Sequence, residues 1–133
     1  MELFSYEDEW IKVRCKESET LDHCLIVHLN GNLNHGNLVP FIRGLETVRS
    51  EFGNLIFDFR RYRESGETTY SSLFGFVAEV RKHGGEVVFC EVPQQTQEIF
   101  DLLGASRTLA ITKTLQDAIA SLKNRGTTAR GGI

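Results

Sequence analysis

The chain has 133 residues, of which 41% are hydrophobic and 25% charged, and its formal net charge is −3. This length and composition are typical of one soluble domain with a single core. The negative charge gives no whole-protein basis for binding nucleic acid, and no apolar run approaches the roughly 18 residues of a membrane span. The acidic opening segment lacks the basic residues of a signal peptide, so we expect a cytoplasmic protein.

Four elements are expected in the first half of the chain: strands at 9–15 and 24–33, a helix at 38–52 and a strand at 54–59. The first strand alternates polar with apolar residues, and only a short turn separates it from the second, so the two predict an antiparallel hairpin. The helix has apolar residues at every third or fourth position, with Asn37 as its expected capping residue. The third strand is apolar on both sides, as in a strand covered on both faces.

The second half alternates helices and strands. A helix with an apolar face at 73–80, a strand at 86–92, a helix at 94–105, a strand at 108–112 and a last helix from 113 follow in order. Helices between strands require crossovers, so we predict an α/β fold with a mainly parallel sheet of about five strands, an antiparallel N-terminal hairpin and about four helices. One domain is expected over 1–123, followed by a disordered tail at 124–133.

Few residues indicate catalytic or metal chemistry. Cys15, Cys24 and Cys90 show no CxxC spacing and lie in apolar surroundings, which favours reduced, structural thiols. His28 lies within an apolar strand, as a hydrogen-bonded sheet histidine would, and the histidines show no spacing of metal ligands. Asp58 is a lone carboxylate near a strand end, without a paired base. We therefore expect no enzyme, no metal and no cofactor.

Residues 60–72 form a very polar segment between an apolar strand and the start of a helix. Partner and ligand sites of parallel sheets favour this carboxyl end of the strands. A phosphorylated hydroxyl here would lie at the positive end of the helix dipole, near Arg60, Arg61 and Arg63. Residue chemistry alone favours the simpler interpretation, in which Thr68 or Thr69 caps the helix and the charges are solvated.

Four stretches carry a resemblance to a known family. They are "LNGNLNHGN" at 29–37, "NLIFDF" at 54–59, "VRKHGGEVVFCEVPQQTQEIFDLLGA" at 80–105 and "TKTLQDAIASL" at 112–122. In this order they resemble the STAS domain of bacterial anti-sigma-factor antagonists and related signalling modules, over residues from about 10 to 123. The resemblance implies a STAS-like fold and a non-catalytic role in bacterial signal transduction and transcription regulation, with an anti-sigma factor or serine kinase as the protein partner.

In that family the loop after the third strand usually reads Asp-Ser-x-Gly or Asp-Thr-x-Gly. A partner kinase, which is also an anti-sigma factor, phosphorylates the hydroxyl; the phosphate prevents binding, and a phosphatase restores it. Aligned without a gap from Gly84-Gly85, the segment "GETT" at 66–69 takes the place of this motif. Gly66 then replaces the acid, and Glu67 replaces the phosphorylated residue.

Three interpretations of this loop remain open. A shift by one residue makes Thr68 the acceptor, with Thr69 as a further candidate. A shift by two makes Glu64 and Ser65 the acid–serine pair. Alternatively, Glu67 permanently occupies the place of the phosphate with a single negative charge; this interpretation requires no gap and is favoured.

The polar segment is expected to be the surface that a partner contacts, because arginine and tyrosine are enriched among interface anchors. The expected contacts are Arg60, Arg61, Tyr62, Arg63, Glu67, Thr68 and Tyr70. Two alternatives are an anion or ligand binder, or enzyme, that uses Asp58 and the arginines, and a scaffold that forms a homodimer through the exposed face of the first hairpin and is never phosphorylated.

Overall fold

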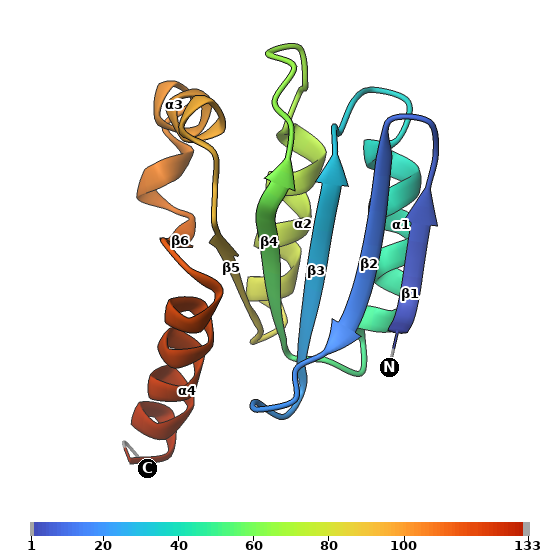
Figure 1. Cartoon of the computed structure of the whole chain (residues 1–133). Helices are drawn as coiled ribbons and strands as arrows, with labels where there is room; N and C mark the ends of the chain where they lie inside the picture. The colour runs from blue at the N-terminus through green and yellow to red at the C-terminus, as the bar shows by residue number, and fades with distance from the viewer. Residues whose placement is uncertain (1, 132–133) are drawn as a thin grey trace.

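The computed structural model describes residues 2–131, and the side chains of residues 2–125. Its elements are β1 (Glu2–Glu7), β2 (Ile11–Glu17), β3 (Cys24–Gly31), α1 (Leu38–Arg49), β4 (Asn54–Tyr62), α2 (Ser71–Lys82), β5 (Glu86–Cys90), α3 (Gln94–Leu102), a 3-10 turn η1 (Ala105–Arg107), β6 (Ala110–Thr112) and α4 (Leu115–Gly131). The six strands lie in chain order across one sheet, antiparallel from β1 to β3 and parallel from β3 to β6 (Figure 1). The predicted α/β class with an antiparallel N-terminal hairpin is confirmed.

Strand β1 is absent from the sequence prediction. It pairs antiparallel with β2, with Ser5 opposite Arg14 and Glu7 opposite Lys12. Its side chains are exposed or half-buried along the whole strand, because β1 is an edge strand that pairs with only one other strand; the half-buried Leu3, Phe4 and Tyr6 pack against the apolar core. Apolar and polar residues alternate from Phe4 to Glu7, but this stretch is short and its apolar residues are only half-buried, so its signal is weaker than that of the other strands.

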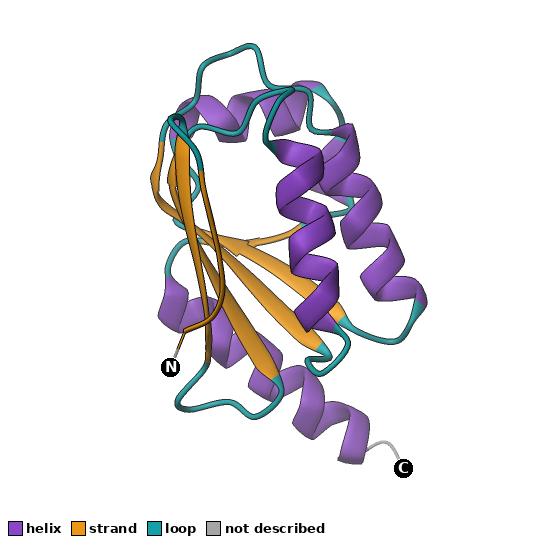
Figure 2. Ribbon diagram, turned by 90° about the vertical axis from the view of Figure 1, so that its right-hand side faces the viewer, coloured by secondary structure: helices purple, strands orange, loops and turns teal. Residues whose placement is uncertain are grey.

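The main core lies between the sheet and the two helices α1 and α2, which cover the same face (Figure 2). Phe57 of β4 is at its centre: its ring centroid lies 6.2 Å from those of Phe41 and Phe76 and 5.4 Å from that of Phe89. These rings come from α1, α2 and β5, so one aromatic residue links both helices to the middle of the sheet. The helical apolar periodicity read from the sequence therefore faces this core.

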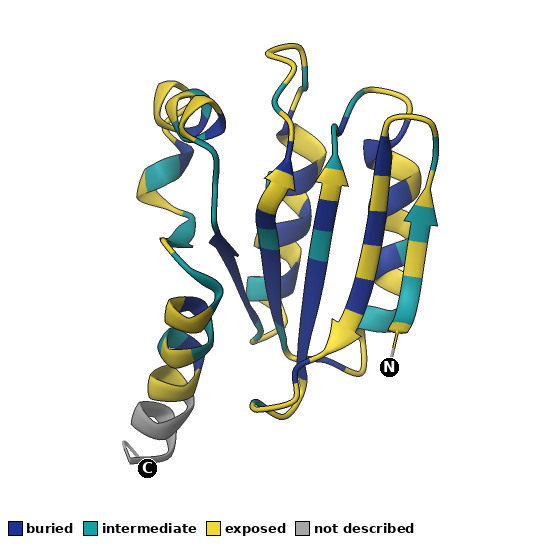
Figure 3. Cartoon of the chain, in the orientation of Figure 1, coloured by how far each residue is buried: buried dark blue, intermediate teal, exposed yellow. Residues whose placement is uncertain are grey.

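Helix α4 lies on the opposite face, where it packs on β4, β5 and β6. A second apolar cluster is buried beneath it: Cys24, Ile26, Ile56, Val88, Cys90, Ala118 and Leu122. Beside α4 the sheet is open, and β2 alternates buried with exposed residues along its length (Figure 3). Lys12, Arg14 and Lys16 point outward there.

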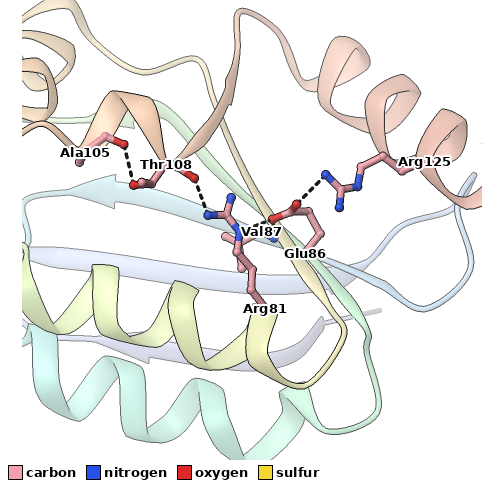
Figure 4. Close-up of polar contacts among 6 residues, drawn as sticks. All are labelled: Arg81, Glu86, Val87, Ala105, Thr108 and Arg125. Atoms are coloured by element: carbon pink, nitrogen blue, oxygen red, sulfur yellow. Dashed lines mark hydrogen bonds and ion pairs between the residues drawn. The ribbon is translucent and has the colours of Figure 1, made fainter. Parts of the chain in front are cut away.

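A buried carboxylate joins α4 to the rest of the domain (Figure 4). Glu86, at the start of β5, is 6% exposed. Its Oε1 accepts hydrogen bonds from Arg81 Nε at 2.7 Å and from the Val87 amide at 2.8 Å, and its Oε2 pairs with Arg125 Nη1 at 2.8 Å. Arg81 also donates to the carbonyl of Thr108. One carboxylate thus links α2, β5 and α4.

The end of the chain differs from the predicted disordered tail at 124–133. The backbone of α4 remains helical to Gly131, and Arg125, within the predicted tail, is held by Glu86. Residues 132 and 133 lie outside the described residues, and the assignment of 1–123 to one domain stays a prediction. Among the helices of the described part, none is long and apolar enough to cross a membrane.

Candidate functional site

Strand β4 continues to Tyr62, so part of the predicted polar loop is strand. The register with β3 shifts by one residue before Asn30, which pairs with Arg61. Because of this irregularity, Arg60 and Arg61 are both exposed although they are neighbours in a strand. Both line the open sheet face, whereas the loop proper comprises residues 63–70. The sequence did not separate these two surfaces.

A buried polar network fixes the loop from within. Tyr62 and Tyr70 are 5% and 1% exposed, and their hydroxyls lie 2.7 Å apart. The Tyr70 hydroxyl donates to Glu64, whose Oε1 also accepts a hydrogen bond at 2.9 Å from the hydroxyl of Thr96 in α3. Burial first, and then the neighbouring Tyr62 and Glu64, raise the pKa of Tyr70, which keeps the phenol protonated and able to donate.

This burial corrects the expectation that Tyr62 and Tyr70 contact a partner. Each ring packs among other aromatic side chains, Tyr62 on Phe59 and Tyr70 on Phe100. The hydroxyls satisfy each other and Glu64, so the polar ends of both side chains are paired inside the protein. Their contribution to the site is to hold the loop rather than to present a surface.

The loop is also attached to the segment that follows β3. The Thr68 hydroxyl donates to the carbonyl of Leu33, and the side-chain amide of Asn32 donates to the carbonyl of Arg63 at 3.0 Å. The Arg63 amide donates to the carbonyl of Gly31 at 2.7 Å. Thr68 is therefore half-buried with its hydroxyl engaged, and Arg63 is exposed with its backbone fixed.

The predicted helix caps differ from the structure. Tyr70 precedes the first residue of α2, and no side chain caps this helix, so neither Thr68 nor Thr69 has the expected capping role. Asn37 does occupy the position before α1, but its Oδ1 accepts a hydrogen bond from the Asn34 amide instead of capping the helix. Thr69 remains exposed.

Ser65, Glu67 and Thr69 form the exposed rim of the loop. Beside this rim lies a shallow pocket of about 370 Å³, lined by residues that include Ser65, Glu67, Trp10 and His35. Trp10 is 58% exposed and belongs to the β1–β2 turn, where its amide donates to Asp8 Oδ1 at 2.8 Å. Trp10 is absent from the predicted contacts, although an aromatic residue on the polar face of an alternating strand indicates an exposed apolar surface.

The other predicted carboxylate, Asp58, lies on the open sheet face. Its Oδ2 is 2.8 Å from Nδ1 of His28, and its Oδ1 accepts the Arg60 amide at 3.0 Å. The prediction of a hydrogen-bonded sheet histidine at His28 is confirmed. Partial burial raises the pKa of Asp58, but the hydrogen bonds from His28 and the Arg60 amide, together with nearby positive charge, lower it by more, so the net pKa lies below the usual value.

Asp58→Asn is expected to make the free energy of unfolding depend less on pH in the acid range. A depressed folded-state pKa stabilises the fold above the unfolded-state value, near 3.8, and this contribution is lost as the pH falls through the folded-state pKa. The urea midpoints of the wild type and the variant should therefore differ most near neutral pH and converge as the pH falls below 3.8. If the urea midpoints of the two proteins changed in parallel with pH over this range, the charge of Asp58 would not contribute to stability.

The three cysteines are buried and free. Burial raises the pKa of the Cys15, Cys24 and Cys90 thiols to about 12. At neutral pH these groups are therefore protonated, which makes them poor nucleophiles and poor metal ligands. No cluster of three potential metal-binding side chains occurs among the described residues.

Comparison with known proteins identifies the family. The family model of the STAS domain matches residues 16–118, which include β3 to β6 and the loop. This chain belongs to the STAS family. The resemblance inferred from the sequence is thus confirmed, and the loop at 63–70 occupies the position between the third predicted strand and its following helix in this STAS domain. A search of curated protein sequences found no significant match.

Solved structures with the same fold share little sequence with this STAS domain. An anti-sigma factor antagonist from Mycobacterium paratuberculosis is 14% identical, with a TM-score of 0.68 over 85% of this chain and 94% of that chain. A putative anti-sigma factor antagonist from Thermotoga maritima is 15% identical, with a TM-score of 0.68 over 82% and 92%. The Bacillus protein SpoIIAA in its phosphorylated form is 15% identical, with a TM-score of 0.59 over 81% and 98%.

Proposed function

We propose that this STAS domain is a non-catalytic, cytoplasmic regulatory module that binds a protein partner of the anti-sigma factor or kinase type. Its contact surface is the loop rim of Ser65, Glu67 and Thr69, together with the exposed Arg63. The family and the anti-sigma factor antagonists of the same fold support this role. The internal hydrogen bonds of the loop support it further, because a pre-organised surface loses less conformational entropy on binding.

The exposure of Glu67 is the observation that carries the proposal. Its carboxylate makes no hydrogen bond or ion pair with any residue whose side chain the structure describes, and it lies at the rim beside Ser65. A carboxylate that the fold does not use is available to a partner. We infer that Glu67 holds a single fixed negative charge at the position of the phosphorylated residue, so that phosphate, which would carry about −1.5 to −2, does not switch binding at this position.

Among the candidate acceptors, the geometry favours Ser65 and Thr69 over Thr68. Ser65 and Thr69 are exposed, and the Ser65 Oγ accepts a hydrogen bond from the Glu67 amide at 3.2 Å. The Thr68 hydroxyl donates a hydrogen bond to the Leu33 carbonyl, so a kinase would first have to break this hydrogen bond. A kinase acting on these hydroxyls would therefore reach Ser65 and Thr69 before Thr68.

The proposal is tested by intact-mass and phosphopeptide analysis of the protein recovered from its native cells. The wild type is compared with Glu67→Ser, and Glu67→Gln is the matched control because it removes the charge without adding a hydroxyl. We expect no phosphate on the wild type or on Glu67→Gln, and phosphate at the substituted position of Glu67→Ser.

Two other outcomes would contradict parts of the proposal. Phosphate on Ser65, Thr68 or Thr69 of the wild type would mean that the acceptor is displaced and that Glu67 is not a fixed substitute. Absence of phosphate on all three proteins would remove the support for a kinase partner and favour the self-associating scaffold, which size-exclusion chromatography would then detect as a stable homodimer.

A further inference from the structure

A cationic groove lies on the open face of the sheet, away from the loop rim. It has a volume of about 490 Å³ and runs between β2 and the beginning of α4. Five of its lining residues are basic: Lys12, Arg14 and Lys16 of β2, and Arg60 and Arg61 of β4. These cations are concentrated on one face although the whole chain has a net charge of −3.

The charges of this groove are poorly neutralised within the protein. Lys12 and Arg14 lie 3.8 and 3.9 Å from Glu7 and Glu2 of β1, in exposed pairs at the limit of ion-pair distance. Among the residues whose side chains are described, none forms an ion pair with Lys16, Arg60 or Arg61.

Asp58 is the one carboxylate among the described residues that line the groove, and it is hydrogen-bonded within the protein. Both oxygens of Asp58 are occupied, by the His28 ring and by the Arg60 amide, and its side chain is only 12% exposed. Asp58 keeps its negative charge, but the five Lys and Arg side chains that line the groove outnumber it, so the field at the outer surface is positive.

The spacing of the cations indicates what they fit. Lys12, Arg14 and Lys16 occupy alternate positions of one strand, so their Cα atoms are about 6.7 Å apart. Alternate side chains of any extended peptide have the same spacing. A segment that lies along β2 with acidic residues at alternate positions would therefore present one carboxylate to each cation.

The lining of the groove argues against single-stranded nucleic acid as the occupant. Sheet surfaces that bind nucleic-acid bases use exposed aromatic side chains as stacking platforms. No Phe, Tyr or Trp is among the described residues that line this groove; besides its Lys, Arg and Asp residues, they are His28, Leu29, Asn30 and Leu115. Charge without stacking fits carboxylates better than bases.

We propose that the open face of β2, β3 and β4 binds an extended acidic segment of a partner protein. The acidic side chains pair with Lys12, Arg14 and Lys16 along β2, and Arg60 and Arg61 complete the groove from β4. This second interaction surface is separate from the loop rim and does not depend on phosphorylation. It allows the domain to contact a partner at two places at once, which strengthens binding through effective concentration.

The test is a titration of the isotopically labelled full-length chain, followed by NMR. The probe is a peptide of about seven residues, the length of a strand, with Glu at alternate positions and Ser between them. The same peptide with Gln in place of Glu is the uncharged control. We expect only the Glu peptide to shift the backbone signals of Lys12, Arg14, Lys16 and His28, and we expect its affinity to fall when the ionic strength rises to about 0.15 M.

Two variants of equal charge change locate the site. Arg14→Gln combined with Lys16→Gln removes two charges from the groove. It should lower the affinity for the Glu peptide by roughly three- to tenfold, as expected for exposed ion pairs. Arg43→Gln combined with Lys82→Gln removes two exposed charges from α1 and α2, on the other side of the sheet, and should leave the affinity unchanged. Because all four side chains are exposed, both variants should retain the wild-type fold in their NMR spectra.

Three results would overturn the proposal. Equal binding of the Glu and Gln peptides would show that charge does not carry the interaction. Shifts confined to residues 63–70 would place the peptide at the loop rim instead. Tighter binding of a single-stranded oligonucleotide than of the Glu peptide, with shifts at the same groove residues, would mean that the face recognises phosphates of nucleic acid rather than carboxylates of a protein.

Discussion

Glu86→Gln is expected to lower the free energy of unfolding by about 3 kcal/mol, because it removes the charged partner of a largely buried ion pair. The side chain keeps its size, so the loss reports on charge and hydrogen bonding rather than on a cavity. Arg81 would keep its positive charge in a partly buried position without a carboxylate, and Arg125 of α4 would lose its partner. For a domain of this size, the melting temperature should fall by about 10 °C.

Urea unfolding followed by circular dichroism measures this change. Glu79→Gln is the matched control, because Glu79 is exposed and lies 3.8 Å from His83 in a surface pair; we expect a change below about 0.5 kcal/mol. Arg125→Gln should cost less than Glu86→Gln, since the Arg125 side chain is 62% exposed and water can replace part of its contact. A loss at Glu86 no larger than at Glu79 would mean that the buried carboxylate does not hold the helices together.

Gly31→Ala is expected to lower the free energy of unfolding by about 3 kcal/mol or more, because backbone strain and severe overpacking act together at this position. Gly31 has a φ of +120°, which L-residues with side chains rarely adopt. A Cβ at this position would lie 2.3 Å from the carbonyl oxygen of Trp10 and 2.9 Å from the Cα of Ile11. Both are backbone atoms, so the β1–β2 turn would have to move away from the end of β3, and the exposed Trp10 would move with it.

Gly66→Ala separates the two causes of this cost. Gly66 also has a positive φ, of 80°, but no atom lies within 4 Å of a Cβ built there. The free energy of unfolding of Gly66→Ala should therefore fall by only about 1 kcal/mol, through backbone strain. Equal losses for the two variants in urea unfolding would show that the contact with Trp10 has no effect, whereas the larger loss expected for Gly31→Ala measures the overlap with the turn.

The fold was predictable wherever one side of an element is buried in a regular pattern. Residues 11–15 alternate as expected, and the apolar positions of α1 and α2 face the main core. Strand β1 has a weaker pattern, because only Phe4 to Glu7 alternate and its apolar residues are half-buried at the edge of the sheet. The charges of Arg60 and Arg61 are typical of a loop, but an irregular register between β3 and β4 lets both side chains point outward from a strand. The register depends on which residues of the two strands pair, and this cannot be seen in the local sequence.

The candidate site was less predictable because its internal contacts join residues far apart in sequence. Tyr62 and Tyr70 were expected at the surface on account of their hydroxyls, yet these are satisfied by each other and by Glu64. Thr96 of α3 completes that network across 32 positions of the chain. A hydroxyl near a helix start is typical of a cap, but Thr68 binds the Leu33 carbonyl instead, since the segment after β3 lies beside the loop.

The order of the strands in the sheet has a consequence for how the molecule is assembled. Each strand pairs with the one that precedes it in the chain, from β1 to β6. During synthesis, every new strand can therefore add to an edge that already exists, and no strand has to insert between two others. The contact between Glu86 and Arg125 can form only after α4 has left the ribosome, so closure of the domain has to wait for this helix.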